Sequence, residues 1–254
     1  MMYIDQMNRR CVLESPPKRI VSLVPSQSEL IWDLGLKKEL VGITKFCIHP
    51  GDMYRSVERI GGTKQLNIEK IQQLKPDLII GNKEENVKEQ IEQLERDFPL
   101  WMSDVNTLED ALNMISAVAE LCHRKSEGEQ LVQNIKTSFQ THTQQSQDRI
   151  LYLIWKDPFM AVGKNTFIDA MIKQAGFHNS ILTERYPEIT MREINELNPD
   201  QIFLSTEPFP FNETTRAEIE QQSGIKTRLV DGELFSWYGS RLMKSASYFT
   251  MLHH

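Results

Sequence analysis

The chain repeats one helix–turn–strand pattern in its two halves. Residues 69–80 recur as residues 192–203, and each copy places Pro-Asp between an amphipathic helical run and an apolar run. Proline cannot continue a helix, and aspartate favours the turn that follows. Upstream of each copy lies a second matched pair, an apolar strand and a helical run that ends at Gly35 or Gly176. Two halves of similar plan predict two α/β lobes with a small-molecule cleft between them.

A long helical run separates the two halves. Its apolar residues Leu131, Ile135 and Phe139 recur every four positions, and the run is otherwise mostly polar and contains no proline. A mostly polar helix between globular parts is typical of a spanning connector. We therefore predict an N-terminal α/β lobe at residues 1–123, a bridging helix at 124–145 and a C-terminal α/β lobe at 146–254. Each lobe is expected to hold a small, mostly parallel sheet, because strands and helices alternate along the chain.

Hydrophobic periodicity and turn residues predict the individual elements. Apolar strands are expected at residues 20–24, 40–44, 78–80, 100–102, 150–154 and 227–230. Helices are expected at residues 28–34, 68–74, 86–98, 108–122, 166–174, 216–222 and 242–252. Loops are expected at residues 46–50, 61–62, 158–163 and 207–211.

Composition excludes several classes of protein. A net charge of −6 argues against nucleic-acid binding, which normally requires a basic face. No apolar stretch approaches the about 20 residues of a membrane span, so we expect no membrane insertion. Cys11, Cys47 and Cys122 are odd in number and show no paired spacing, which argues against a disulfide framework. The first residues lack the apolar core of an export signal, and Cys11 follows two arginines rather than a lipoprotein cleavage site.

A set of motifs in fixed order resembles the helical-backbone (class III) solute-binding proteins, the receptors of ABC importers for vitamin B12, ferric siderophores and haem. The similarity covers nearly the whole chain from about Pro17 onward. The matching stretches are residues 22–29, 67–78, 155–160, 163–168, 176–179, 231–233 and 237–241. The resemblance implies two α/β lobes bridged by one long rigid helix, a ligand held in the intervening cleft, and modest lobe movement on binding. It implies no built-in cofactor, because the cobalt or iron chelate is the cargo, and we expect a monomer.

The resemblance also implies a site for docking onto an ABC permease. In the vitamin B12 and siderophore receptors, one glutamate per lobe contacts arginines of the permease. Glu69, seven residues before Pro76, matches the first glutamate, whereas Arg192 stands seven residues before Pro199. Glu193 follows one position later, but a helix turns by about 100° per residue, so the two positions are not equivalent. A shift of one residue can still present Glu193 on the same surface, so we assign docking to Glu69 and Glu193, with Arg192 as the departure from the family pattern.

Aromatic residues near strand ends are the candidate ligand contacts. Trp155, Phe159, Trp237 and Tyr238 lie in or beside expected loops at strand ends, the side of an open α/β sheet where ligands bind. Aromatic rings can cover the apolar faces of flat macrocycles and large chelates. The alternative is that each ring packs its own lobe. Three residues of the first half join the candidate set, and they are Pro25, Ser26 and Phe46.

Charged and metal-binding side chains complete the candidate site. Arg241 can bind a carboxylate or phosphate in bidentate fashion, or form a salt bridge instead. Lys64 is a candidate cleft cation, or a solvated surface residue. Cys47 and His49 are soft and borderline ligands two positions apart, able to coordinate cobalt or iron axially. No second cluster completes a coordination set, and cysteine is often a buried small hydrophobe.

The sequence therefore predicts a non-enzymatic receptor for a metal chelate, with corrinoids first and ferric siderophores or haem next. The alternative is a cytoplasmic binding protein that has kept the fold and lost the transporter, which Arg192 and the start of the chain favour. The family is periplasmic or surface-anchored, so the location stays open between the two. A third hypothesis, an enzyme acting on a corrinoid or metal chelate, would require Cys47 or His49 to be essential. The sequence shows no phosphate loop, nucleophile elbow or HExxH helix.

Overall fold

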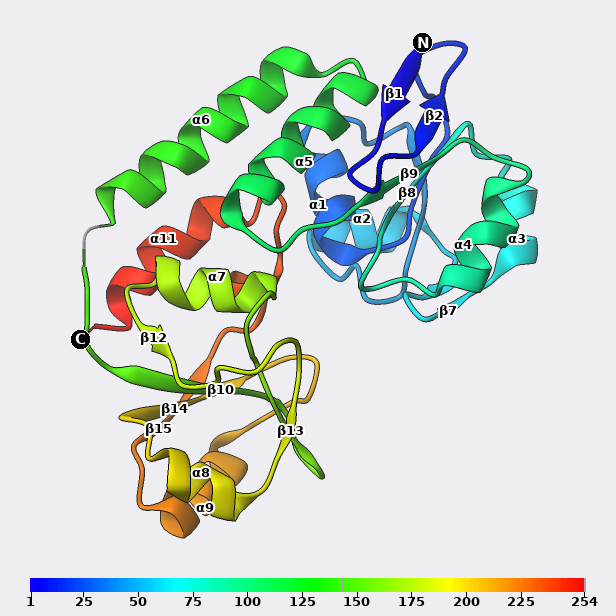
Figure 1. Cartoon of the computed structure of the whole chain (residues 1–254). Helices are drawn as coiled ribbons and strands as arrows, with labels where there is room; N and C mark the ends of the chain where they lie inside the picture. Colours follow the sequence, from blue (N-terminus) through cyan, green and yellow to red (C-terminus); the bar gives the residue numbers. More distant parts are fainter. Residues whose placement is uncertain (143, 254) are drawn as a thin grey trace. The chain divides into compact units, whose positions relative to one another are not determined.

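The computed structural model describes residues 1–142 and 144–253, and it consists of two compact units (Figure 1). Unit 1 comprises Met1–Val105, Glu109–Ile135 and Tyr238–Arg241. Unit 2 comprises Asn106–Leu108, Lys136–Trp237 and the stretch from Leu242 onward. The expected long helix is present as α6 (Lys125–Thr141), and its residues are divided between the two units. The lobe boundaries at residues 123 and 146 stay a prediction.

Unit 1 is built on a five-stranded sheet in the order β5-β4-β3-β8-β9, and all of its neighbouring strands are parallel. These strands are β3 (Ile20–Ser22), β4 (Leu40–Ile43), β5 (Glu58–Arg59), β8 (Leu78–Asn82) and β9 (Leu100–Ser103). Two antiparallel pairs lie outside the sheet, β1 (Met2–Ile4) with β2 (Arg10–Val12) and β6 (Gly61–Gly62) with β7 (Gln65–Leu66). The helices are α1 (Pro25–Asp33), α2 (Gly51–Ser56), α3 (Ile68–Leu74), α4 (Lys88–Glu95) and α5 (Leu108–Leu121).

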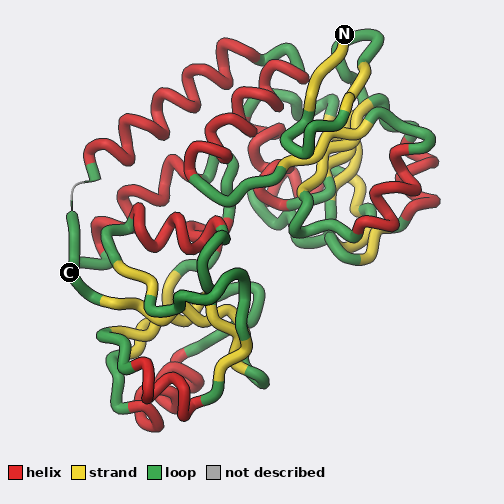
Figure 2. The backbone as a smooth tube through the Cα atoms, viewed as in Figure 1, coloured by secondary structure: helices red, strands yellow, loops and turns green. Residues whose placement is uncertain are grey.

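Helices cover both faces of this sheet (Figures 1 and 2). On one face, Val21 and Ile79 of the central strands pack in one core cluster with Ile71 of α3 and Ile91 of α4. Figure 1 shows α1, α2 and α5 on the other side of the strands. A parallel sheet buried on both faces requires continuous apolar strands, and every residue of β3, β8 and β9 is buried.

Unit 2 contains a mixed six-stranded sheet in the order β13-β11-β10-β14-β15, with β12 also pairing β10. The strands are β10 (Arg149–Trp155), β11 (Phe159–Ala161), β12 (His178–Asn179), β13 (Glu188–Ile189), β14 (Gln201–Ser205) and β15 (Thr227–Val230). The strands β10, β12, β14 and β15 are parallel, whereas β11 runs antiparallel to β10 and β13. The helices are α7 (Phe167–Gln174), α8 (Met191–Leu197), α9 (Glu213–Ser223), α10 (Glu233–Ser236) and α11 (Leu242–Met251).

Alternation along the strands of unit 2 divides its core between the two faces of the sheet. Leu151 and Ile202 pack in one cluster with Ile194 of α8 and Ile219 of α9. On the opposite face, Tyr152 meets the ring of Phe235 in α10 at 5.1 Å between centroids. Successive strand residues point to opposite faces, so one strand serves both cores.

The repeated motif folds in nearly the same way in both units. Asn67 caps α3 and Thr190 caps α8, and each side chain accepts a hydrogen bond from the backbone N–H three residues later. Both helices end at a left-handed residue, Lys75 (φ 47°) and Asn198 (φ 44°). The Pro-Asp turn then leads directly into β8 or β14. The predicted α/β fold, with a repeated plan in the two halves, is confirmed.

Most expected elements are present with altered ends. The helix at 68–74 and the strand at 227–230 have the predicted bounds. The loop prediction for residues 158–163 is wrong, because β11 lies within it, and the expected turn at 61–62 is the strand β6. Short strands of this kind depend on pairing with a neighbouring strand, which local periodicity does not reveal.

Candidate ligand-binding site

The carboxyl edge of the unit 1 sheet gathers several of the predicted residues. The parallel strands β3, β4 and β8 all end there, and ligands of open α/β sheets bind at this edge. Pro25 and Ser26 follow β3 in the first turn of α1, where both are buried. Phe46 follows β4, and half of its surface (50%) is exposed. An exposed aromatic ring at this edge is available to cover an apolar ligand face.

Two lysines accompany these residues. The ammonium group of Lys45 lies 5.1 Å from the centre of the Phe46 ring. Lys64 is exposed and donates a hydrogen bond of 2.6 Å to the backbone carbonyl of Glu84, just after β8. The predicted cation therefore sits near the carboxyl edge, where its charge is available to a ligand.

Cys47 and His49 differ in their surroundings. The Cys47 thiol is fully buried and lies 3.2 Å from the hydroxyl oxygens of both Ser28 and Thr44. Burial raises the pKa of this thiol to about 11. A neutral, buried thiol is a poor metal ligand, because thiolate is the coordinating form. His49 is half-buried in the loop before α2, and among the described residues no three His, Cys, Asp or Glu side chains cluster around a metal position.

The carboxyl end of β10 in unit 2 carries the other exposed aromatic candidate. Trp155 is 40% exposed and meets the ring of Phe209 edge-on at 5.5 Å between centroids. Phe159 begins β11 and is partly buried against the core cluster of Leu151 and Leu153. Trp155 therefore offers contact area to a ligand, whereas part of Phe159 packs its own unit.

Trp237 is packed within unit 2, which was the alternative to a ligand contact, and its role as a ligand contact stays a prediction. Its side chain is only 6% exposed, and its indole N–H donates a hydrogen bond of 3.1 Å to the Glu207 carboxylate in the same unit. Ser236 donates a second hydrogen bond, of 2.5 Å, to the same oxygen. Burial raises the pKa of Glu207. The indole therefore anchors a partly buried carboxylate and offers a ligand little area.

Tyr238 and Arg241 are both engaged within unit 1, and their contact with a ligand stays a prediction. Tyr238 is 5% exposed and donates a hydrogen bond of 2.6 Å to Glu85. The Arg241 guanidinium forms two hydrogen bonds to Glu29, of 2.8 and 2.9 Å, and both side chains are more than nine-tenths buried. This ion pair occupies the bidentate geometry that a ligand carboxylate would have used. Of the two alternatives for Arg241, the structure shows the salt bridge.

The sequence reasoning missed two glutamates at the carboxyl edges. Glu85 follows β8 in unit 1, and Glu207 follows β14 in unit 2. Each is bonded by one of the two adjacent aromatic residues, Tyr238 and Trp237. An available signal was their position, because each glutamate comes soon after the strand that ends one copy of the repeat.

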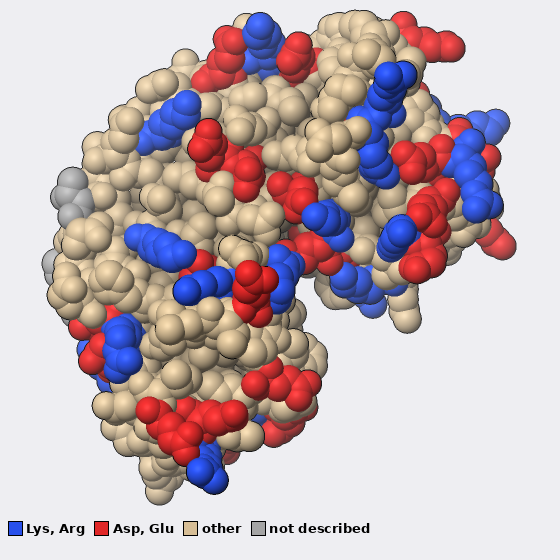
Figure 3. Space-filling view, in the orientation of Figure 1, with Lys and Arg blue, Asp and Glu red and all other residues tan. Residues whose placement is uncertain are grey.

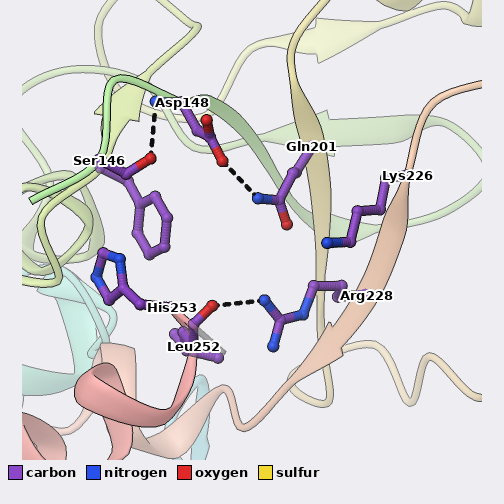
Figure 4. Close-up of a pocket in the computed structure, with 8 residues that line it drawn as sticks. Ser146, Asp148, Gln201, Lys226, Arg228, Leu252 and His253 are labelled. Carbon is purple, nitrogen blue, oxygen red and sulfur yellow. Dashed lines mark hydrogen bonds between the residues drawn. The ribbon is translucent and has the colours of Figure 1, made fainter.

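A separate polar pocket lies at the opposite edge of the unit 2 sheet (Figure 4). Its lining includes Asp148, Gln201 and Lys226, which stand at or just before the starts of β10, β14 and β15. Figure 4 shows Gln201 donating to Asp148 and Arg228 donating to the carbonyl of Leu252. The pocket volume of about 190 Å³ is below the roughly 300–1,000 Å³ of typical ligand pockets. This pocket is too small for a macrocycle.

The predicted docking glutamates are both exposed, in the first turns of their helices. The carboxylate of Glu193 is already used, because it accepts hydrogen bonds of 2.7 Å from both the backbone N–H and the hydroxyl of Thr190. Arg192 pairs with Glu196 at 2.8 Å. Figure 3 shows acidic side chains gathered over the α8 and α9 end of unit 2, and elsewhere on this face the two signs of charge are mixed.

Comparisons with known proteins agree with this architecture. A Bacillus subtilis protein, an uncharacterised ABC transporter substrate-binding lipoprotein, is 26% identical over 78% of this chain and 67% of its own length. The crystal structure of the periplasmic vitamin B12-binding protein of Vibrio cholerae has a TM-score of 0.80 at 21% identity, covering 94% of this chain and 98% of that one. A periplasmic haem-binding protein from Pseudomonas aeruginosa has a TM-score of 0.82 at 20% identity, covering 93% and 92%.

The structural similarities, at such low identity, confirm the fold. Across the part of the chain that the structure describes, no helix is both long and apolar enough to cross a membrane. The names of these relatives describe binding proteins, and none of them supports the cytoplasmic alternative. The sequence model of the periplasmic binding protein family matches residues 20–230, so this chain belongs to that family.

Proposed function

We propose that this protein is the substrate-binding receptor of an ABC importer and that its ligand is a metal chelate, with a corrinoid first and haem or a ferric siderophore next. The observation that carries the proposal is the pair of exposed aromatic side chains, Phe46 (50%) and Trp155 (40%), at the carboxyl ends of parallel strands. Exposed aromatic rings at these edges can cover the faces that flat chelates present.

The remaining contacts come from the same edges. Pro25 and Ser26 would supply backbone groups at the start of α1, and Lys64 would supply a cation beside Glu84. Phe159 would add apolar area beside Trp155. His49 remains the axial ligand to test, since the burial of Cys47 leaves that thiol unsuited to coordination. The metal arrives and leaves with the ligand, and the protein acts as a monomer.

Relatives named as vitamin B12- and haem-binding proteins support this class of ligand. A lipoprotein relative and periplasmic relatives support a position outside the cytoplasmic membrane. Glu69 is the proposed permease contact on unit 1, and Glu193, with Arg192 beside it, is the proposed contact on unit 2. The substitution Glu69→Lys, which reverses the charge, is expected to abolish stimulation of the cognate permease and to leave ligand affinity unchanged.

The test of ligand binding is an equilibrium titration followed by tryptophan fluorescence and corrected for absorption by the ligand. Cyanocobalamin, hemin and a panel of ferric siderophores are each added to the purified protein. Saturable binding of one class at micromolar concentration or below supports the proposal. Trp155→Ala should weaken that binding by about ten-fold or more, as expected for an aromatic side chain that the bound ligand covers. Met251→Ala is the matched control, because Met251 is a large apolar residue 60% exposed at the end of α11. Saturable binding of none of these ligands would contradict the proposal.

A further inference from the structure

A short segment of the second half of the chain is built into unit 1. Tyr238–Arg241 belongs to unit 1, although Trp237 and Leu242 on either side belong to unit 2. We call these four residues the returning segment. Ser240 donates a hydrogen bond of 2.6 Å to Asp33 of α1, and Arg241 is paired with Glu29 of the same helix. Two side chains of α1 therefore hold one end of the segment.

The backbone of the returning segment lies directly against α1. A Cβ atom added to Gly239 would lie 2.3 Å from the carbonyl oxygen of Ser26, closer than such atoms ever approach. A glycine is required for this approach. The buried pair of Arg241 and Glu29 then holds the segment on α1, because separating it would break an ion pair in the interior.

This placement fixes the hydroxyl of Tyr238 on the Glu85 carboxylate at 2.6 Å. Burial, and then the negative charge of Glu85, raise the pKa of Tyr238 well above its ordinary value, so the phenol remains a donor. Glu85 is also held from the backbone side, because its N–H donates to the Asn82 side chain at 3.1 Å. The Asn82 side chain in turn donates a hydrogen bond of 3.0 Å to the hydroxyl of Ser103 in β9. Glu85 is therefore held at its backbone by Asn82 and at its carboxylate by Tyr238.

Glu85 lies at the carboxyl edge where we place the ligand. It follows β8, as Ser26 follows β3 and Phe46 follows β4, and its charge helps to raise the pKa of the Cys47 thiol after burial does. Glu84 adds a second carboxylate, while Lys64 contributes a cation through its bond to the Glu84 carbonyl. The bond from Tyr238 sets the orientation of the Glu85 carboxylate at this edge.

A carboxylate in a fixed position can discriminate between the candidate ligands by the polar groups at the periphery of their rings. A corrinoid carries neutral carboxamides, whose N–H groups donate to a carboxylate, whereas haem carries two propionate carboxylates that a neighbouring carboxylate repels. Selectivity of this kind combines an attractive contact to one ligand with repulsion of another. We propose that Glu85, oriented by Tyr238 of the returning segment, is a specificity-determining residue that selects amide-rimmed corrinoids over carboxylate-bearing haem. This inference rests on the proposed function and assigns the ligand within it.

The test compares dissociation constants for cyanocobalamin and hemin by calorimetry in the wild type, Glu85→Gln and Tyr238→Phe. The wild type should bind cyanocobalamin more tightly than hemin. Glu85→Gln should weaken cyanocobalamin binding by about ten-fold, the effect of one charged hydrogen bond, and strengthen hemin binding. Tyr238→Phe should shift the ratio in the same direction by a smaller factor. Glu89→Gln removes the same charge from an exposed position in the first turn of α4 and should leave both constants unchanged.

The outcomes separate this inference from the proposed function. Tighter binding of hemin than of cyanocobalamin by the wild type, or an unchanged ratio in Glu85→Gln, overturns the role of Glu85 and leaves the receptor proposal standing. Binding of neither ligand by a folded wild type overturns this inference, and the siderophore titrations then decide the receptor proposal. Unchanged far-ultraviolet dichroism confirms that each variant is folded. Should Tyr238→Phe fail to fold, Ser240→Ala provides a milder release of the returning segment.

Discussion

In both units, the aspartate of the Pro-Asp turn accepts backbone hydrogen bonds at the start of a central strand, but the number of these bonds differs. In unit 1, the Asp77 carboxylate accepts hydrogen bonds of 2.8 Å from the backbone N–H groups of both Lys18 and Arg19, just before β3. In unit 2, Asp200 accepts one such bond, of 2.7 Å, from Arg149 at the start of β10. Arg19 also donates to the carbonyl of Leu74 at the end of α3, and Arg149 donates to that of Asn198 just after α8. The Pro-Asp turn therefore connects the end of the helix to the start of the neighbouring strand. We call Asp77 and Asp200 the clamp carboxylates.

The units differ more in which residues pair with a buried acidic side chain, in α1 of unit 1 and in α7 of unit 2. In unit 2, Asp169 of α7 is satisfied locally, by Lys173 one turn later and by Asn179. In unit 1, Glu29 of α1 takes its partner, Arg241, from the far end of the chain. A local partner can be lost cheaply, whereas a remote, buried partner joins distant parts of the sequence. This difference marks unit 1 as the one that depends on the returning segment.

The largest expected effect is therefore that of Arg241→Met. It leaves Glu29 buried without its partner and should destabilise unit 1 by about 3 to 5 kcal/mol. Lys173→Met is the matched change in unit 2, and it should cost less than about 1 kcal/mol because Lys173 is 60% exposed and Asn179 remains. Hydrogen exchange of the amides of α1 and α7 measures both. Equal losses in the two variants would refute the distinction.

Removing the clamp carboxylates should produce an intermediate effect. Asp77→Ala deprives two backbone N–H groups of a charged acceptor and should cost about 2 kcal/mol, whereas Asp200→Ala deprives one and should cost about 1 kcal/mol. Urea unfolding followed by amide signals from each unit gives the two values. A greater loss from Asp200→Ala would reverse the proposed ranking of the clamps.

The helix caps differ by a smaller amount. Thr190→Ala breaks a reciprocal capping box with Glu193, whereas Asn67→Ala breaks a single bond to the N–H of Lys70. Each change should cost about 1 kcal/mol, with Thr190→Ala the larger of the two. Thr190→Ser should restore most of the loss, and its failure to do so would show that the cap is not the cause. Thermal unfolding of the variants supplies the comparison.

The smallest effect concerns pH. Hydrogen bonds from the Thr190 side chain and backbone lower the pKa of Glu193 from its ordinary value of 4.5. Because the folded-state pKa is lowered, the stabilisation of α8 is present above the unfolded-state value and is lost as the pH falls through the folded one. A carbon-13 NMR titration should show Glu193 ionising below its ordinary range. Titration at or above that range would mean that the capping box does not persist in solution.

Much of this fold follows from local sequence. The Pro-Asp repeat predicted α3 with β8 and α8 with β14, because helix caps, apolar periodicity and turn residues all favour the same structure. The two-residue strands β5, β6, β7, β12 and β13 escaped prediction, because they depend on pairing with a neighbouring strand. The exposed aromatics Phe46 and Trp155 were predictable from their positions after strands. The engagement of Arg241, Tyr238 and Trp237 was not, since Glu29, Glu85 and Glu207 are far away in sequence.

The most direct test of the central claim is hydrogen–deuterium exchange of the protein with and without cyanocobalamin. We predict that the ligand slows exchange at the carboxyl edges, in residues 44–50 and 83–87 of unit 1 and 155–159 of unit 2. Exchange at the polar pocket around Asp148 and Lys226 should not change. Slower exchange at that pocket, or no change at the carboxyl edges under saturating ligand, would contradict the assignment of the corrinoid site.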